Sequence, residues 1–106
     1  MDCRIAALMH ELKTDLAALY GHRLRDVYLY GSYARGEQDQ ESDVDVIIVL
    51  DQVSRYGAEI EITGGLVSRL SLRHRVAISR VFVSEKSWAA RETSFVDRAR
   101  EEAVLV

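Results

Sequence analysis

The segment VDVIIVLD, residues 44 to 51, constrains the fold more than any other part of this sequence. Apart from its acids, it is apolar on both faces of an extended strand. Such a strand needs cover on both sides, which the central strand of a sheet between helices has. The segment therefore predicts an α/β (α+β) protein with a small sheet and flanking helices.

Further strands and a first helix are visible on either side of this segment. Residues 2 to 20 have apolar side chains at helical spacing, with Asp2 placed to cap the start and Gly21 to close the end. Residues 26 to 31 and residues 75 to 83 are each predicted to form a strand.

The C-terminal part predicts two short helices. Ser84 is placed to cap a helix that runs through Trp88. Ser94 and Asp97 have the spacing of a capping box and predict the start of a last helix.

Residues 54 to 75 fit two structures. The apolar stripe Ile62, Leu66 and Leu70 has helical spacing, but Gly64 and Gly65 together cost a helix about 2 kcal/mol relative to alanine. The alternation in EIEIT, followed by Gly-Gly, would instead suit a hairpin. We predict the helix.

Composition restricts the class of protein. The 106 residues predict one domain, residues 1 to 106, and the net charge of −3 argues against general nucleic-acid binding. No apolar run approaches the roughly 20 residues of a membrane span, and the N-terminus does not resemble a signal peptide. Cys3 is the only cysteine, so we expect a reducing, cytoplasmic location.

Two carboxylates stand where the buried strand begins. Alternate side chains of a strand share a face, so Asp43 and Asp45 point the same way, with Cα atoms about 6.6 Å apart. Carboxylates at this spacing can share a hard divalent cation, and Mg²⁺ suits a site of few carboxylates that water and phosphate oxygens complete. Acids at a strand end can also be solubilising residues only.

A turn that suits a phosphate group precedes these acids. Gly31 and Ser32 follow the first strand directly, and such a turn offers free backbone N–H groups and a hydroxyl donor. Arg35 can neutralise phosphate charge, and Gly36 lets the chain leave the turn. An anion site and a cation site on adjacent elements are what a metal–nucleoside triphosphate requires.

The motif G-S-x-x-R-G, followed by S-D-x-D and an apolar strand, resembles the DNA polymerase β-like nucleotidyltransferase superfamily. The nearest resemblance is to its minimal nucleotidyltransferases, and the order of elements fits over nearly the whole chain. The residues that carry the match are Gly31, Ser32, Arg35, Gly36, Ser42, Asp43 and Asp45. The resemblance implies a nucleotidyltransferase-like fold with a mixed sheet.

The resemblance also implies roles for these residues. Asp43 and Asp45 would be catalytic and would ligate Mg²⁺, whereas the other five would bind the nucleotide. The reaction implied by the resemblance is transfer of a nucleoside monophosphate, AMP from ATP, to a hydroxyl with release of pyrophosphate. Such proteins often form toxin–antitoxin pairs with a helical HEPN-type protein, and some adenylylate that partner.

The sequence departs from the superfamily at one important position. The next strand usually supplies a third carboxylate, which is a metal ligand and the base for the acceptor hydroxyl. The matching residue here is Ser79, which cannot take either role well at neutral pH. Two hypotheses follow: an active enzyme, or a nucleotide-binding subunit that acts by binding a HEPN-type partner. Either would need a partner or a homodimer to complete so small a site.

Overall fold

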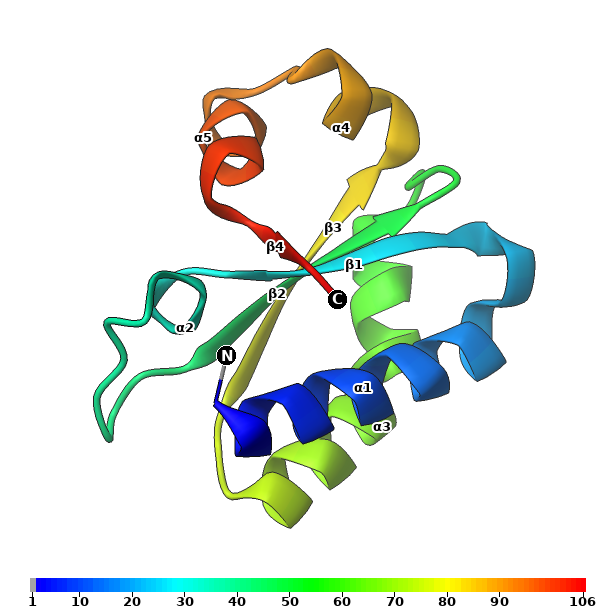
Figure 1. Ribbon diagram of the computed structural model, residues 1–106. Helices are drawn as coiled ribbons and strands as arrows, with labels where there is room; N and C mark the ends of the chain where they lie inside the picture. The colour runs from blue at the N-terminus through cyan, green and yellow to red at the C-terminus, as the bar shows by residue number, and fades with distance from the viewer. Residues whose placement is uncertain (1) are drawn as a thin grey trace.

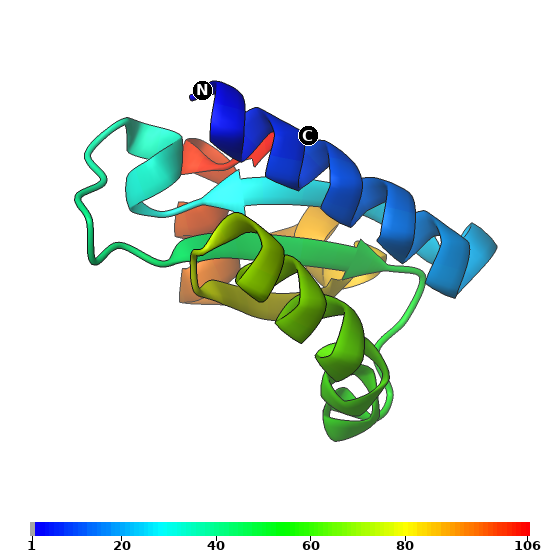
Figure 2. The ribbon, with the colours of Figure 1, turned by 90° about the horizontal axis from the view of Figure 1, so that it is seen from below.

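The computed structural model describes residues 2–106 and contains a four-stranded mixed sheet between two layers of helices. Helices α1 (Cys3–Tyr20) and α3 (Tyr56–His74) cover one face, and α4 (Glu85–Ala90) and α5 (Ser94–Glu102) cover the other (Figure 1). Figure 2 shows α1 and α3 crossing the sheet on the same side. This arrangement confirms the predicted α/β class.

The strand order is β3-β2-β1-β4, so the apolar segment is internal. Strand β2 pairs antiparallel with β1 and parallel with β3, and β1 pairs antiparallel with β4. The strands are β1 (Leu24–Tyr30), β2 (Val44–Leu50), β3 (Ile78–Ser84) and β4 (Val104–Leu105). The 3₁₀ turn η1 (Gly21–Arg23) leads into β1, and the short helix α2 (Ser32–Arg35) follows it.

Strand β2 holds the two layers together, because its side chains enter a separate apolar cluster on each face. Val46 and Ile48 pack with α1 in one cluster, whereas Ile47 and Val49 pack with Trp88 of α4 in the other. All residues of the strand except Asp45 are buried. The prediction of a central strand covered on both sides is therefore confirmed.

Helix α1 begins and ends as the sequence predicts. The Asp2 side chain accepts a hydrogen bond from the Arg4 N–H, and Gly21 caps the C-terminus with a φ of 60°. Within residues 2–106, no helix has the length and apolarity needed to span a membrane.

Helix α3 confirms the choice of helix over hairpin, but its predicted buried stripe is partly wrong. Leu70 is fully buried, whereas Ile62 is 49% exposed. The polar residues Glu59 and Thr63 are buried instead, because Arg23 and Tyr20 bind Glu59, and Arg80 donates to the Thr63 hydroxyl. These partners allow polar groups to occupy the core side of the helix.

The C-terminal region also differs from prediction in detail. Ser84 caps α4 as expected, accepting a hydrogen bond from the Ser87 N–H. The cap of α5, however, is Thr93 rather than Ser94, because the Thr93 hydroxyl accepts from the Val96 N–H. Position N3 is therefore a valine, so the predicted capping box is wrong. The sequence pattern also missed β4, since two residues show no alternation.

Candidate active site

Asp45 is the second residue of β2 and alternates with Ile47 and Val49, so it lies on the sheet face that α4 and α5 cover. Asp43 lies just before the strand. Strand pairing aligns Tyr30 of β1, Asp45 of β2 and Ser79 of β3 in one row across the sheet. Residues aligned in this way project from the same face. The position of Ser79 beside Asp45, predicted from the sequence, is therefore confirmed.

The turn after β1 touches this row. Gly31 is buried and has a φ of +75°, a left-handed conformation that favours glycine. A Cβ atom at this position would lie 2.3 Å from Oδ2 of Asp45. The backbone of the turn and the carboxylate are thus in direct contact, and only glycine permits this approach.

The Asp45 carboxylate has an unfavourable electrostatic environment. Burial raises its pKa, the negative charge of Asp43 raises the pKa further, and Arg35 lowers it. No hydrogen bond from residues 2–106 reaches either the Asp43 or the Asp45 carboxylate. Two neighbouring carboxylates without donors form a site that a cation would stabilise.

Short helix α2 presents its first backbone N–H groups beside these acids. The N–H groups of Ala34 and Arg35 bond to the Gly31 carbonyl, whereas no acceptor within residues 2–106 binds the N–H groups of Ser32 or Tyr33. Gly36 ends the turn in the left-handed region, with its N–H bonded to the Ser32 carbonyl. The predicted helical turn after Gly-Ser, and the exit at Gly36, are both present.

Two other predicted nucleotide-binding residues have partners in the protein itself. Arg35 forms ion pairs with Glu37 at 3.0 Å and with Glu102 at 3.3 Å. The Ser42 hydroxyl accepts from the Asp39 N–H at 2.9 Å and so orders the loop before Asp43. Nucleotide binding by these two side chains stays a prediction.

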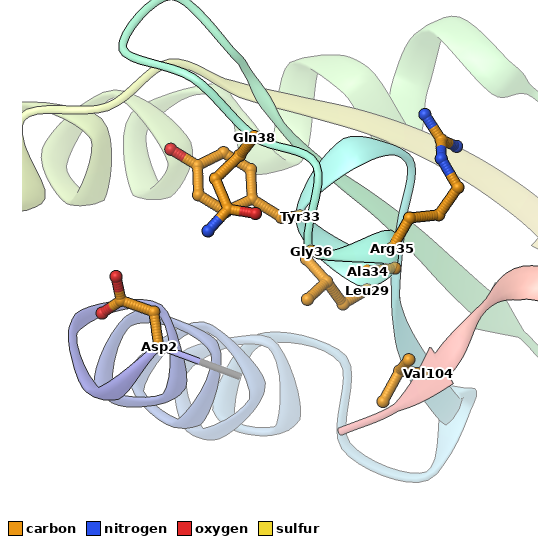
Figure 3. Close-up of a pocket in the computed structure, with 8 residues that line it drawn as sticks. All are labelled: Asp2, Leu29, Tyr33, Ala34, Arg35, Gly36, Gln38 and Val104. Atoms are coloured by element: carbon orange, nitrogen blue, oxygen red, sulfur yellow. The ribbon is translucent and has the colours of Figure 1, made fainter.

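Two cavities lie beside helix α2 and the loop that follows it. One of about 310 Å³ lies between α2 and the start of α1, where Tyr33, Gln38 and Asp2 line it (Figure 3). The Arg35 side chain in Figure 3 points away from these three residues. Neither predicted metal ligand lines this cavity.

A second cavity of about 310 Å³ opens at Asp43, and its charged lining includes Arg4 and Arg75. The sequence analysis assigned no role to either arginine. Arg75 is the C-cap of α3 and has a φ of 54°, but the sequence alone does not reveal this conformation.

A third metal ligand is missing from the part of the chain that the structure describes. In residues 2–106, no group of three or more His, Cys, Asp or Glu side chains is placed to hold a metal ion. Asp51, the next acid along the chain after Asp45, lies just beyond the other end of β2 and is bound by Arg23. The site therefore has two carboxylates and a serine.

Comparison with known proteins agrees with the motif and the fold. Residues 9–106 match the nucleotidyltransferase domain family. A proposed protein adenylyltransferase of Methanocaldococcus jannaschii is 33% identical over 102 residues, covering 96% of this chain and 98% of the relative. The protein adenylyltransferase MntA of Thermococcus cleftensis is 30% identical over 69 residues, covering 65% of this chain and 68% of that protein.

Solved structures show the same fold. A nucleotidyltransferase structure from Sulfolobus solfataricus has a TM-score of 0.58 at 22% identity, with coverage of 99% of this chain and 86% of the other. A toxin–antitoxin structure with AMP-PNP has a TM-score of 0.60 at 22% identity, with coverage of 89% and 68%. Together with the family match, these results show that the chain belongs to the nucleotidyltransferase domain family, as a minimal nucleotidyltransferase of the DNA polymerase β-like superfamily.

Proposed function

We propose that this protein is a Mg²⁺-dependent nucleotidyltransferase that transfers AMP from ATP to a hydroxyl on a partner protein. The observation that carries this proposal is the contact between the Gly31 turn and the Asp45 carboxylate. It supports one site for both the phosphates and the cation of a metal–nucleotide complex. The two relatives named as protein adenylyltransferases support the choice of AMP and of a protein acceptor.

Asp43 and Asp45 fit a magnesium ion. Their oxygens are the hard ligands that Mg²⁺ prefers. Burial, and the charge of Asp43 beside it, raise the pKa of Asp45, so a bound cation would relieve an unfavourable charge. When bound, the ion would neutralise charge on the phosphates and the two acids. The carboxylates' own role is to fix the position of that charge beside the Gly31 turn.

The turn and the nearby arginine would hold the phosphates. The N–H groups of Ser32 and Tyr33, which no protein acceptor within residues 2–106 binds, supply donors, and the Ser32 hydroxyl adds another. Arg35 is 42% exposed, and its ion pairs with Glu37 and Glu102 are also exposed. Exposed pairs contribute little stability, so a triphosphate can compete for the guanidinium.

The relatives also support a choice of partner. The toxin–antitoxin structures with the same fold support an antitoxin role, and we propose a helical HEPN-type toxin as the acceptor. A homodimer is the alternative assembly. In either assembly the second chain would present a hydroxyl to the α-phosphate and complete a small, open site.

The serine beside Asp45 favours a second candidate function. Ser79 cannot accept a proton from the acceptor hydroxyl as a carboxylate does. A protein that binds the nucleotide and its partner without transferring AMP would need no base. The two functions share the same nucleotide site and differ only in the chemical step.

Transfer of label from α-³²P-ATP to the purified partner separates the two functions. Ser79→Asp restores a carboxylate beside Asp45 and should raise transfer by 10²–10⁴-fold, the usual value of general-base help. If neither form transfers label or releases pyrophosphate while both bind Mg–ATP, the binding subunit is correct. Good transfer by the parent, reduced in Ser79→Asp, would place the base elsewhere.

A further inference from the structure

An aromatic pair stands at the side of the candidate site. Tyr30 of β1 is aligned with Asp45, so its ring projects from the same sheet face as the carboxylate. Phe95 of α5 packs against this ring edge to face, with 5.5 Å between the centroids. We refer to Tyr30 and Phe95 as the aromatic wall.

Phe95 reaches over β2 toward β3. Its ring also lines a cavity of about 280 Å³ with Val81 and Val83 of β3. Val81 is aligned with Ile47, the next residue after Asp45 whose side chain lies on this face. Tyr30 therefore lies level with the carboxylate, whereas the cavity begins one strand step, about 6.6 Å, beyond it. Figure 1 shows α5 on this side of the sheet, opposite α1 and α3.

The wall is not simply part of the core. Tyr30 and Phe95 are both half-buried, unlike Trp88, which is buried on the same face. The Tyr30 hydroxyl makes no hydrogen bond within residues 2–106. An accessible ring surface and a free hydroxyl beside a phosphate site suit a planar, partly polar ligand group.

We propose that the aromatic wall binds the nucleobase of the nucleotide. Because the two rings are nearly perpendicular, the base would stack on the face of one ring and contact the other with its edge. This inference rests on the proposed Mg–nucleotide site and specifies where the rest of the nucleotide lies. The cavity at Asp43 suits a base less well, because Arg4, Arg75 and acids of the loop line it. That polar cavity remains open to the acceptor.

Calorimetric titration with two probes tests the assignment. Tyr30→Leu and Phe95→Leu should each raise the Kd for Mg–ATP by roughly 5-fold to 100-fold, the range for loss of one base-stacking contact. The Kd for magnesium tripolyphosphate, which has no base, should change by less than about 2-fold. Unchanged affinity for Mg–ATP in both variants would overturn the proposal, as would equal weakening with both probes.

A matched control removes a similar ring elsewhere. Tyr56 packs edge to face on Phe82 at 5.7 Å, on the face of the sheet that α1 and α3 cover. Tyr56→Leu should leave the affinity for Mg–ATP unchanged. If Tyr56→Leu weakens Mg–ATP binding as much as Tyr30→Leu does, the loss of any aromatic ring weakens binding, and the proposal fails.

A measurement on the parent protein avoids dependence on variants. Nuclear Overhauser contacts between adenine H2 or H8 and the Phe95 ring protons should appear in the Mg–ATP complex, and contacts to other aromatic rings alone would contradict the proposal. Failure of the underlying site looks different. If the double variant Asp43→Asn with Asp45→Asn binds both probes with the affinity of the parent protein, the proposed metal–nucleotide site is wrong, whether or not the aromatic wall binds a base.

Discussion

The two ends of strand β2 carry acids in opposite electrostatic situations. Asp51, just after the strand, accepts hydrogen bonds from the Gln52 N–H at 2.7 Å and from Arg23 at 3.1 Å. The Gln52 N–H, and to a lesser degree Arg23, hold the pKa of Asp51 below its usual range. Arg23 also binds the buried Glu59 at 2.8 Å, so one guanidinium serves two carboxylates.

Asp45, at the other end, has no such partner. Burial and the charge of Asp43 raise its pKa, and Arg35, which lowers it, is itself paired with Glu37 and Glu102. Five residues of one strand, 46–50, thus separate an acid that stabilises the fold from an acid whose burial is unfavourable. Asp51 therefore stabilises the fold, and the contrast supports our proposal that Asp45 binds a ligand that brings positive charge.

The largest effect on stability should come from the structural end. Arg23→Ala leaves the Glu59 carboxylate buried without its cation and should lower the free energy of unfolding by about 3 kcal/mol. Urea denaturation measures it. Arg91→Ala is the control, because its ion pairs with Asp97 and Glu101 are exposed and should contribute little to the free energy of unfolding. Equal losses would refute the distinction.

Gly31→Ala should damage the functional end. The added Cβ collides with the Asp45 carboxylate and occupies a left-handed conformation, so we expect a stability loss of about 2 kcal/mol and weaker Mg–ATP binding. Gly36→Ala isolates the conformational cost, because Gly36 has a φ of +72° but open space around its Cβ position. If both variants bind Mg–ATP equally well, close approach at Gly31 is unimportant.

Ser32→Ala should have a smaller effect that is confined to binding. Loss of one hydrogen bond to a charged phosphate should weaken the affinity for Mg–ATP by about 1–2 kcal/mol, with stability almost unchanged. Isothermal calorimetry and thermal melts measure the two quantities. Parent-like affinity would mean that the hydroxyl does not contact the phosphate.

The smallest effects distinguish the two acids by the sign of their pH dependence. The pKa of Asp45 is higher in the folded protein than in the unfolded chain, where it is near 3.9, so the folded protein loses stability as the pH rises through these two values. Asp45→Asn removes this loss and should raise the Tm at pH 7 without metal. The pKa of Asp51 is lower in the folded protein than in the unfolded chain, so Asp51 stabilises the fold at pH values above its unfolded pKa. This stabilisation is lost as the pH falls, and Asp51→Asn should lower the Tm at pH 7.

Both differences in Tm should shrink as the pH approaches 3, where the carboxylates become protonated. Thermal melts between pH 3 and pH 7 in the presence of EDTA measure them. A destabilised Asp45→Asn protein at pH 7 would contradict the distinction between the two ends.

The sequence predicted the features that depend on local pattern. The buried run of β2, the caps of α1 and the Gly31–Ser32 turn follow from short-range chemistry, and each is present in the structure. The alignment of Ser79 with Asp45 was expected from the resemblance to the superfamily, and the pairing of β2 with β3 confirms it.

Features that depend on distant partners were not predicted. Glu59 and Thr63 replace Ile62 on the buried side of α3 because Arg23, Tyr20 and Arg80 come from other elements. The contact of Phe95 with Tyr30 depends on how α5 packs on the sheet, which no periodicity reveals. Polar burial and packing between layers are therefore the parts of this site that needed the structure.

The most direct test of the account is calorimetry on the double variant Asp43→Asn with Asp45→Asn. We expect it to fold, to melt at or above the parent Tm without metal, and to lose Mg²⁺-dependent ATP binding. Asp97→Asn with Glu101→Gln removes the same charge from an exposed cluster and should bind Mg–ATP as the parent does. Unchanged Mg–ATP affinity in the first double variant would contradict the assignment of these acids as the metal site.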